Sequence, residues 1–415
     1  MNLLYNISIY ITWFLLKIIA IFNKKINLFV RGRKNTFGEL AENISKNDEI
    51  IWFHCASLGE FEQGRPLIEK IKTKHPNFKI VLTFFSPSGY EVQKNYTLAD
   101  VITYLPFDTK NNAKKFFDLV HPKMAIFIKY ELWPNILSEL EKRKIETILI
   151  SGVFRPNQVF FKAYGFWMRK SLKAFSYFFV QNELSKNLLK SIGFVNSSVC
   201  GDTRFDRVYE ITKQNNHLQF IEDFIQNRYV LIAGSTWPKD EELLVNYINN
   251  YASDDEKFII APHNITSNGI EDLINSIQKK TTLFSDKIKN NEAQVFIVNT
   301  VGILTKIYSY ANVAYIGGGF EKDGIHNILE PATFGIPLVI GPKFDKFQEA
   351  KDLVNLNACE IVNNENELRT HLNKLFQDED YRLSRKKITR EYILKNIGAS
   401  DIILNYVSKK IIGVF

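Results

Sequence analysis

Residues 313–342 read VAYIGGGFEKDGIHNILEPATFGIPLVIGP and contain one complete unit of an α/β fold. An apolar run (313–316) leads into three glycines, a helix-opening segment follows, and a second apolar run (337–340) closes the unit. A strand, a loop, a helix and a second strand in this order predict a parallel βαβ unit. Ligands of such sheets bind beyond the carboxyl ends of the strands, so we expect a ligand at the glycine loop.

The same alternation extends through most of the chain. Further candidate strands lie at 50–54, 79–83, 124–128, 147–150 and 177–181, and again at 229–234, 257–261 and 295–298. A polar helical stretch (208–228) separates the two groups. The pattern predicts two doubly wound domains with parallel sheets, 37–212 and 213–415, with a cleft between them. The last helices are candidates to pack back on the first domain.

The N-terminus carries the chain's longest apolar stretch. Residues 3–22 read LLYNISIYITWFLLKIIAIF and would extend about 30 Å as a helix, one hydrocarbon thickness. Basic residues follow the stretch and no small-residue cleavage site does, which predicts an uncleaved membrane anchor within residues 1–36 and a cytoplasmic bulk. Two alternatives stay open: a buried helix of a soluble fold, and, because of Lys17, a helix that lies in the membrane interface.

Composition and charge exclude several classes of protein. The chain has 415 residues and a formal net charge of +8, of which residues 1–38 supply six basic side chains and no acidic one. The rest is nearly neutral, which argues against nucleic acid as a partner and for anionic lipid at one basic end. The three cysteines lie far apart, and no residue spacing suggests a metal site, a P-loop or a nucleophile elbow.

Two acidic residues follow strands of the first domain. Glu60 ends the segment His54-Cys-Ala-Ser57-Leu-Gly-Glu60, in the first turn of a predicted helix. A helix N-terminus favours an ionised carboxylate, which suits a general base. The alternative is a capping box of Ser57 and Glu60. Glu131 precedes Leu-Trp-Pro directly after strand 124–128, and its alternative role is structural.

Arg204 lies near the end of the first domain, in the sequence GDTRFD (201–206). Its guanidinium could hold a phosphate or a carboxylate through two hydrogen bonds. The alternative is a surface ion pair with Asp202 or Asp206.

The second domain carries the features of a nucleotide site. Asn327 is a candidate N-cap with Glu330 at the third helical position, where free backbone N–H groups can receive a phosphate. The Glu330 carboxylate can accept hydrogen bonds from ribose hydroxyls. Two further segments follow strands of the same domain: Pro262 and His263, and the loop of Val301, Gly302 and Ile303.

In combination, these motifs resemble those of the 3-deoxy-D-manno-octulosonic acid (Kdo) transferases, membrane-anchored bacterial enzymes of lipid A–core assembly. The resemblance extends from the N-terminal stretch to about residue 400. It rests on VRGR (30–33), H-x-x-S-x-G-E (54–60), YLPFD (104–108), ELWPN (131–135), RFD (204–206) and GGG…HNxLEP…GP (317–342).

The resemblance implies a GT-B fold and an inverting glycosyltransferase. The donor would be CMP-Kdo, without a metal or other cofactor, and the acceptor a lipid A precursor, lipid IVA. It also implies a location at the bacterial inner membrane with the catalytic domains on the cytoplasmic side. The alternatives are another GT-B nucleotide-sugar transferase or epimerase, and a non-catalytic membrane scaffold.

The resemblance also assigns roles to residues. Glu60 matches the family's catalytic base, and Arg204 matches a basic residue that assists the leaving group or the transition state. The CMP contacts fall on Pro262, His263, Val301, Gly302, Ile303, Asn327, Ile328, Leu329 and Glu330.

The chain departs from the family pattern at three places. Lys129-Tyr130-Glu131 stands where Glu-Thr-Glu is common, so the transition-state role of the first Glu is either lost or taken by Glu131. His263 stands where Arg is usual, and the loop 299–303 has Asn and Ile where acids are common.

Overall fold

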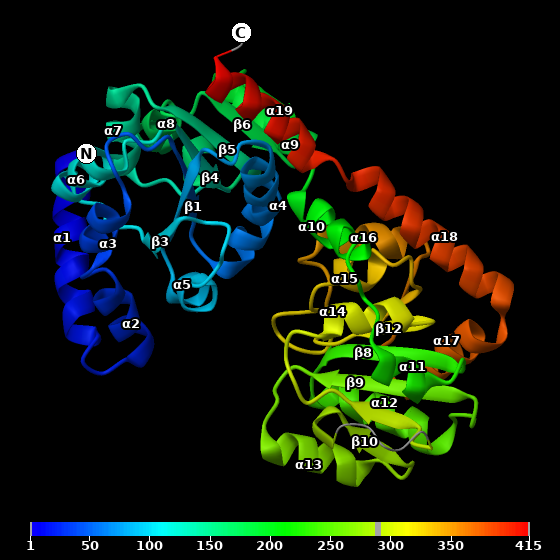
Figure 1. Ribbon diagram of the computed structural model, residues 1–415. Coiled ribbons are helices and arrows are strands. Elements are labelled where there is room, and N and C mark those ends of the chain that lie inside the picture. The colour runs from blue at the N-terminus through cyan, green and yellow to red at the C-terminus, as the bar shows by residue number, and fades with distance from the viewer. Residues whose placement is uncertain (1, 287–291, 414–415) are drawn as a thin grey trace. The chain divides into compact units, whose positions relative to one another are not determined.

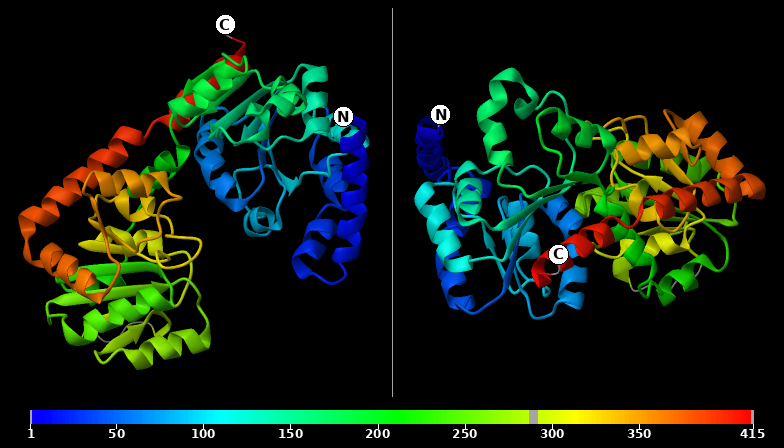
Figure 2. Two further views of the ribbon diagram at one scale, coloured as in Figure 1. Left: turned by 180° about the vertical axis from the view of Figure 1, so that it is seen from behind. Right: turned by 90° about the horizontal axis from the view of Figure 1, so that it is seen from above.

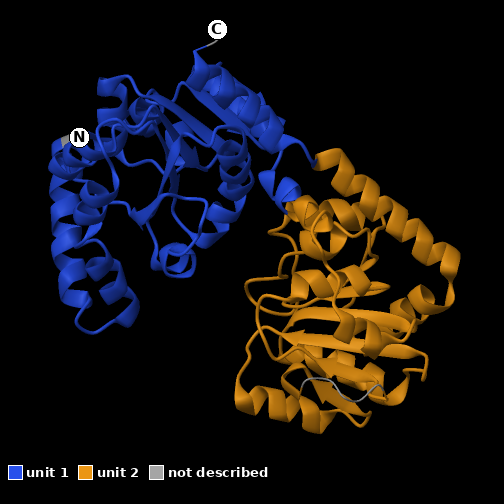
Figure 3. Cartoon of the chain, in the orientation of Figure 1, with its two compact units in different colours: residues 1–207, 397–415 blue, residues 208–396 orange. Residues whose placement is uncertain are grey.

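The computed structural model describes residues 2–286 and 292–413 (Figure 1). The chain forms two compact units (Figure 3): unit 1 runs to Arg207 and includes the segment from Ile397 onward, and unit 2 is Val208–Asn396. The expected division at residues 212 and 213 therefore lies five residues from the observed one. The last helix, α19 (Ala399–Ile412), belongs to unit 1.

Unit 1 contains a seven-stranded parallel sheet in the order β3-β2-β1-β4-β5-β6-β7. The central strands read as continuous apolar runs because helices cover both faces of the sheet (Figure 2). The five strands predicted for this unit are confirmed. The strands are β1 (Ile50–Cys55), β2 (Lys79–Phe84), β3 (Val101–Tyr104), β4 (Met124–Ile128), β5 (Glu146–Gly152), β6 (Tyr177–Val180) and β7 (Ser197–Val199).

Two separate core clusters cover the two faces of this sheet. One face is packed by α3 (Thr36–Asn43), α6 (Lys110–Val120), α7 (Pro134–Arg143), α8 (Phe166–Leu172) and α9 (Glu183–Ser191). The other is packed by α4 (Leu58–Lys74) and α19. Two further helices of the unit are α5 (Pro87–Gln93) and α10 (Thr203–Thr212), whose last residues fall beyond Arg207.

Unit 2 repeats the architecture with the strand order β10-β11-β9-β8-β12-β13-β14. Its strands are β8 (Tyr229–Thr236), β9 (Glu256–Pro262), β10 (Thr281–Leu283), β11 (Val295–Ile297), β12 (Val313–Ile316), β13 (Leu338–Ile340) and β14 (Cys359–Ile361). Its helices are α11 (Gln219–Ile225), α12 (Pro238–Asn250), α13 (Ser267–Ser276), α14 (Leu304–Ile307), α15 (Leu329–Ala332), α16 (Gln348–Asn355), α17 (Glu365–Gln377) and α18 (Glu379–Asn396).

In each sheet the direction of winding reverses at one place. In unit 1 this switch point lies between β1 and β4, and in unit 2 between β8 and β12. Loops leaving adjacent strands at a switch point diverge to opposite faces and open a crevice at the carboxyl edge. Glu60 and Glu131 follow β1 and β4, and residues 327–330 follow β12, whereas the other candidate residues lie at or after the ends of β7, β9 and β11.

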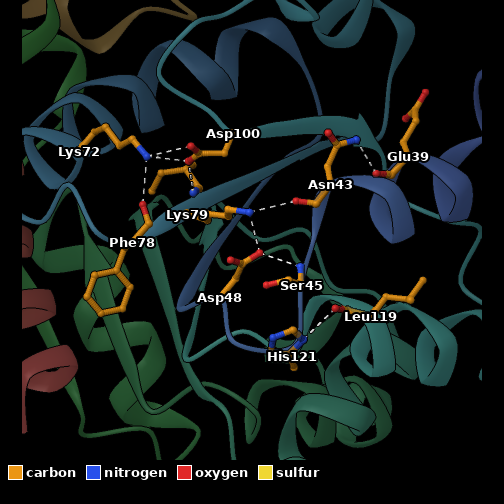
Figure 4. Close-up of polar contacts among 11 residues, drawn as sticks. Glu39, Asn43, Ser45, Asp48, Lys72, Phe78, Lys79, Asp100, Leu119 and His121 are labelled. Atoms are coloured by element: carbon orange, nitrogen blue, oxygen red, sulfur yellow. Dashed lines mark hydrogen bonds and ion pairs between the residues drawn. The ribbon is translucent and has the colours of Figure 1, made fainter.

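The opposite, amino edge of the unit 1 sheet is closed by polar contacts (Figure 4). Lys79 Nζ donates to Asp48 at 2.7 Å, and Lys72 Nζ donates to Asp100 at 2.7 Å. Asp100 also accepts from the backbone N–H of Ile80, the second residue of strand β2. These contacts fix the starts of the strands and leave the carboxyl edge for ligands.

The structure does not bear out the membrane-crossing anchor predicted for residues 3–22. Within residues 2–286 and 292–413, no helix combines the length and the apolar character needed to cross a bilayer. Helix α1 (Asn2–Ile19) instead packs on unit 1: Tyr5 Oη donates to Asp108 at 2.7 Å, and the ring of Trp13 stacks on Phe107 at 4.7 Å between centroids. A short turn joins it to α2 (Lys24–Gly32), which packs beside it.

The outward surface of α1 remains apolar and exposed. The exposed large apolar side chains of the helix and the turn after it are Leu3, Leu4, Ile7, Tyr10, Ile11, Phe14, Leu15, Ile18, Ile19, Ile21 and Phe22. Apolar patches of this extent on a soluble protein mark an interaction site.

Candidate functional site

Glu60 lies in the first turn of α4, at the carboxyl edge of β1. Its Oε2 accepts a hydrogen bond from the Ala56 N–H at 2.5 Å, and the Ser57 side chain makes no capping bond. The reciprocal capping box is therefore absent, although the carboxylate does hold the β1–α4 turn. A Cβ placed on neighbouring Gly59 would meet no described atom within 4 Å, so the turn has open space beside it.

Glu131 follows β4, the strand adjacent to β1, and its ionisation is coupled to that of Glu60. Burial, and then the negative charge of Glu60, raise the pKa of Glu131 to about 7. Burial also raises the pKa of Glu60, while the Ala56 N–H and the Lys129 ammonium lower it. The helix N-terminus was expected to favour the ionised carboxylate of Glu60. That expectation is wrong in direction, because burial raises the pKa of Glu60.

Lys129 comes directly after β4 in a left-handed conformation with φ of 61°. Its N–H donates to the Ile150 carbonyl of β5 at 2.9 Å, which anchors the loop to the next strand. The ammonium is the cation that opposes the effect of burial on Glu60. The carboxyl edge of β1 and β4 thus brings together two carboxyl groups and one ammonium group.

His54 is a positioning residue within this edge. It is fully buried, and burial lowers its pKa to about 3, so the imidazole is neutral. Trp133 Nε1 donates to His54 Nε2 at 3.2 Å, which leaves the ring proton on Nδ1, facing Thr83 Oγ1 at 3.0 Å. The histidine therefore fixes the loop that carries Glu131.

Arg204 is positioned by an acidic neighbour, as the ion-pair alternative predicted. Asp202 accepts from its side chain and its backbone N–H at 2.8 and 2.9 Å. Asp206 has a different task, because it accepts from the N–H groups of Gly398 and Ser400 at the start of α19. Thr203 Oγ1 donates to the Gln63 carbonyl of α4, which holds the start of α10 against α4, the helix that carries Glu60.

In unit 2 the glycine triplet serves loop packing. A Cβ on Gly317 would lie 2.3 Å from the Ser235 carbonyl oxygen, and one on Gly319 would lie 2.5 Å from Gly341 Cα. These glycines let the loop after β12 approach the end of strand β8 and the loop after β13. The sequence predicted that the triplet lets a ligand approach the backbone. Gly317 and Gly319 instead let other backbone segments approach it.

Asn327 and Glu330 form one polar cluster. Asn327 Oδ1 accepts from the Leu329 N–H at 3.2 Å, and Asn327 Nδ2 donates to Glu330 Oε1 at 3.0 Å. Thr305 Oγ1 donates to Glu330 Oε2 at 3.0 Å, which joins the segment to α14, the short helix after β11. Helix α15 has only four residues and one of its N–H groups is already capped, so its terminus is a weaker anion site than the sequence predicted.

The remaining predicted ligand residues surround this cluster. Val301 is 83% exposed, and Gly302 adopts a left-handed φ of 92°. Ile328 and Leu329 are fully buried, so only their backbone can meet a ligand.

Three aromatic rings stack at the carboxyl edge of β8 and β9. The rings of His263 and Trp237 are 4.7 Å apart between centroids, and His326 lies 4.4 Å from His263. Trp237 Nε1 donates to His326 Nε2 at 3.1 Å. Trp237, Thr305 and His326 are missing from the predicted site. Trp237-Pro238 directly follows strand 229–234, so the strand-end rule applied to that strand would have found it.

Among residues 2–286 and 292–413, no three His, Cys, Asp or Glu side chains gather closely enough to hold a metal ion. The three cysteines are buried free thiols.

Comparisons with known proteins show which families the chain resembles. The profile described as "3-Deoxy-D-manno-octulosonic-acid transferase (kdotransferase)" matches residues 31–207. The 3-deoxy-D-manno-octulosonic acid transferase of Aquifex aeolicus is 28% identical over 342 residues, which cover 80% of this chain and 88% of that protein. The chain thus resembles the Kdo transferases over most of its length. Members of this family are glycosyltransferases.

A second relative is longer than this chain. The bifunctional glycosyltransferase/methyltransferase of Fusobacterium nucleatum is 25% identical over 403 residues, which cover 89% of this chain and 61% of that protein. The chain thus spans less than two thirds of that relative.

Solved structures support the GT-B-like fold. UDP-GlcNAc 2-epimerase from Neisseria meningitidis superposes with a TM-score of 0.60 at 17% identity, covering 87% of this chain and all of that one. MurG of Acinetobacter baumannii superposes with a TM-score of 0.53 at 10% identity, covering 87% of this chain and 99% of that one. At these identities the likeness concerns the fold alone.

Proposed function

We propose that the protein transfers Kdo from CMP-Kdo to the glucosamine disaccharide of a lipid A precursor, lipid IVA, in lipopolysaccharide biosynthesis. The observation that carries the proposal is the position of the candidate catalytic residues. Glu60, Glu131 and Arg204 all lie within residues 31–207, the part that matches the Kdo transferase profile. Glu60 and Glu131 follow the two strands of the unit 1 switch point.

Glu60 is the proposed general base. Its carboxylate removes the proton from a primary hydroxyl of the acceptor as the hydroxyl oxygen attacks the anomeric carbon of Kdo. The bond between that carbon and the CMP phosphate breaks, CMP leaves with the bonding electrons, and the anomeric configuration inverts. A base with a moderately raised pKa is a better proton acceptor near neutral pH than an unperturbed carboxylate.

Lys129 and Arg204 supply positive charge to the proposed reaction, which assigns no role to a metal ion. The Lys129 ammonium offsets part of the effect by which burial raises the pKa of Glu60. Arg204, oriented by Asp202, is the cation proposed to stabilise the departing phosphate. Glu131, whose pKa is about 7, is the candidate for the role of the family Glu replaced by Lys129.

Unit 2 is proposed to hold the CMP part of the donor. The polar cluster of Thr305, Asn327 and Glu330 offers acceptors for ribose hydroxyls. His263, exposed beside Trp237, and the exposed loop of Val301 and Gly302 are proposed to line the same ligand.

The protein is proposed to act at the cytoplasmic face of the bacterial inner membrane. The exposed apolar surface of α1 would lie in the membrane interface, with the exposed basic residues of 1–38 among anionic headgroups. Arg33 is not one of them, because it is buried. A lipid acceptor makes such an attachment useful.

The test is incubation of the protein with CMP-Kdo and lipid IVA, followed by mass spectrometry of the lipid. Addition of one or more Kdo residues is expected. If the lipid is unchanged while UDP-GlcNAc is epimerised, an epimerase is the better description. If neither donor reacts, the scaffold alternative gains support.

A further inference from the structure

A cavity of about 360 Å³ lies where α1 turns into α2. Ala20, Ile21 and Asn27 line its neutral part. The lining also includes Val30 and three basic side chains, which are Lys17 of α1, Arg31 of α2 and Lys34 just after it. No acidic residue occurs in residues 1–38, so the cavity is lined by one sign of charge.

The three cations have no carboxylate partner within the described part of the chain. Each is exposed, and none of the ion pairs found among residues 2–286 and 292–413 involves them. Asn27 Nδ2 donates to the Ala20 carbonyl at 2.9 Å, and Asn23 Oδ1 caps the start of α2. These two contacts hold the turn, so the cavity walls are fixed by the protein's own bonds.

Exposed apolar side chains line the cavity or are next in the chain to residues that do. Ile21 is 74% exposed and Phe22 is 86% exposed, and Ile18 next to Lys17 is 43% exposed. Binding of a soluble anion gains nothing from apolar side chains beside the site. Binding of a phospholipid does gain from them, because its hydrocarbon chains lie next to its phosphate and can contact these side chains.

We infer that the α1–α2 cavity binds the phosphate group of an anionic phospholipid while the exposed face of α1 lies among the acyl chains. The inference rests on the proposed membrane attachment and deepens it. Diffuse attraction would use every basic residue near the surface alike. A specific site would bind the phosphate through charge-assisted hydrogen bonds from Lys17, Arg31 and Lys34. Lys24 and Lys25 do not line the cavity and would contribute less to binding.

Two charge-matched variants of the full chain test the inference. Arg31→Gln/Lys34→Gln removes two cations from the cavity, and Lys24→Gln/Lys25→Gln removes two from the same segment outside it. Each variant is sedimented with vesicles of phosphatidylcholine alone and with vesicles that also contain phosphatidylglycerol. Retained CMP binding by unit 2 and an unchanged circular dichroism spectrum serve as folding controls.

The cavity pair is expected to weaken binding to phosphatidylglycerol vesicles at least about tenfold more than the outside pair, in line with the loss of hydrogen bonds to a charged group. Equal losses in both variants would overturn the cavity site while leaving membrane attachment intact. If the wild-type chain binds neither vesicle, both the attachment and the site are wrong. Release by inorganic phosphate, but not by chloride at equal ionic strength, would assign the cavity to a soluble anion and overturn the lipid assignment.

Discussion

Replacing Glu131 by Gln should stabilise the protein at alkaline pH and leave its stability at acidic pH nearly unchanged. Gln has the shape of a protonated Glu and keeps an acceptor for Trp133, but it cannot ionise. Folding raises the pKa of Glu131 from its ordinary 4.5 to about 7, through burial and the charge of Glu60. The stability that the wild-type carboxyl contributes is therefore fully present below pH ~4.5 and lost as the pH rises through about 7.

The size of the effect follows from that difference in pKa. At about 1.4 kcal/mol per pKa unit, the complete loss would be about 3 kcal/mol. Because Glu131 keeps some contact with solvent, about 1–3 kcal/mol is the expected range. In a unit of this size that corresponds to roughly 2–12 °C in the melting temperature of unit 1 at pH 8.

Thermal melts of both proteins between pH 5 and pH 8 measure the difference. Glu141→Gln, an exposed residue of α7 with the same charge change, is the control and should show no such trend. A difference between Glu131→Gln and wild type that is the same at every pH would refute the reasoning. In a Glu60→Gln background the gain should shrink, since one cause of the raised pKa has been removed; an undiminished gain would assign the whole effect to burial.

Three further predictions concern the proposed reaction. Glu60→Gln should lower kcat about 10²–10⁴-fold with CMP affinity unchanged, and activity within a few-fold of wild type would reduce Glu60 to its bond with Ala56. Lys129→Met should move the acidic limb of the pH profile of kcat/KM to higher pH, because the ammonium lowers the pKa of Glu60. Lys129→Arg keeps the charge and should leave the limb in place. An unmoved limb in Lys129→Met would contradict the effect of Lys129 on the pKa of Glu60. Glu330→Ala should weaken CMP binding about tenfold or more in calorimetry, whereas Thr305→Val, which removes only the bond that orients Glu330, should weaken it less. Equal affinity in wild type and Glu330→Ala would make Glu330 structural.

The sequence predicted the central strands of both sheets because they are continuous apolar runs. It missed β3, β7, β10 and β14, whose sequences VITY, SSV, TTL and CEI are short and partly polar. Such strands form because a neighbouring strand supplies hydrogen bonds, and a local pattern does not contain that neighbour.

The strand-end rule predicted the place of the candidate site but not the state of its residues. Glu60 and Glu131 could be located because each follows an apolar run. Their pKa values depend on how deeply the folded unit buries them and on each other's charge, so the helix-terminus argument for an ionised Glu60 gave the wrong direction. The packing role of Gly317 and Gly319 could not be predicted either. The atoms that they approach, the Ser235 carbonyl oxygen and Gly341 Cα, belong to other segments of the chain.

Polar residues distant in the sequence dock the N-terminal helix on unit 1. Residues 3–22 satisfy the length rule for a membrane span, but helix α1 ends at Ile19 and does not combine the length and apolar character needed to cross a bilayer. Tyr5 and Asn6 hold it on unit 1, because their polar groups bond to Asp108 and Asn135 more than a hundred residues away. Asp108 also accepts from the backbone N–H groups that open α7, so the helix docks on a buried carboxylate that the domain needs for itself. A helix held in this way buries one face and keeps the other apolar, which suits a position in the membrane interface.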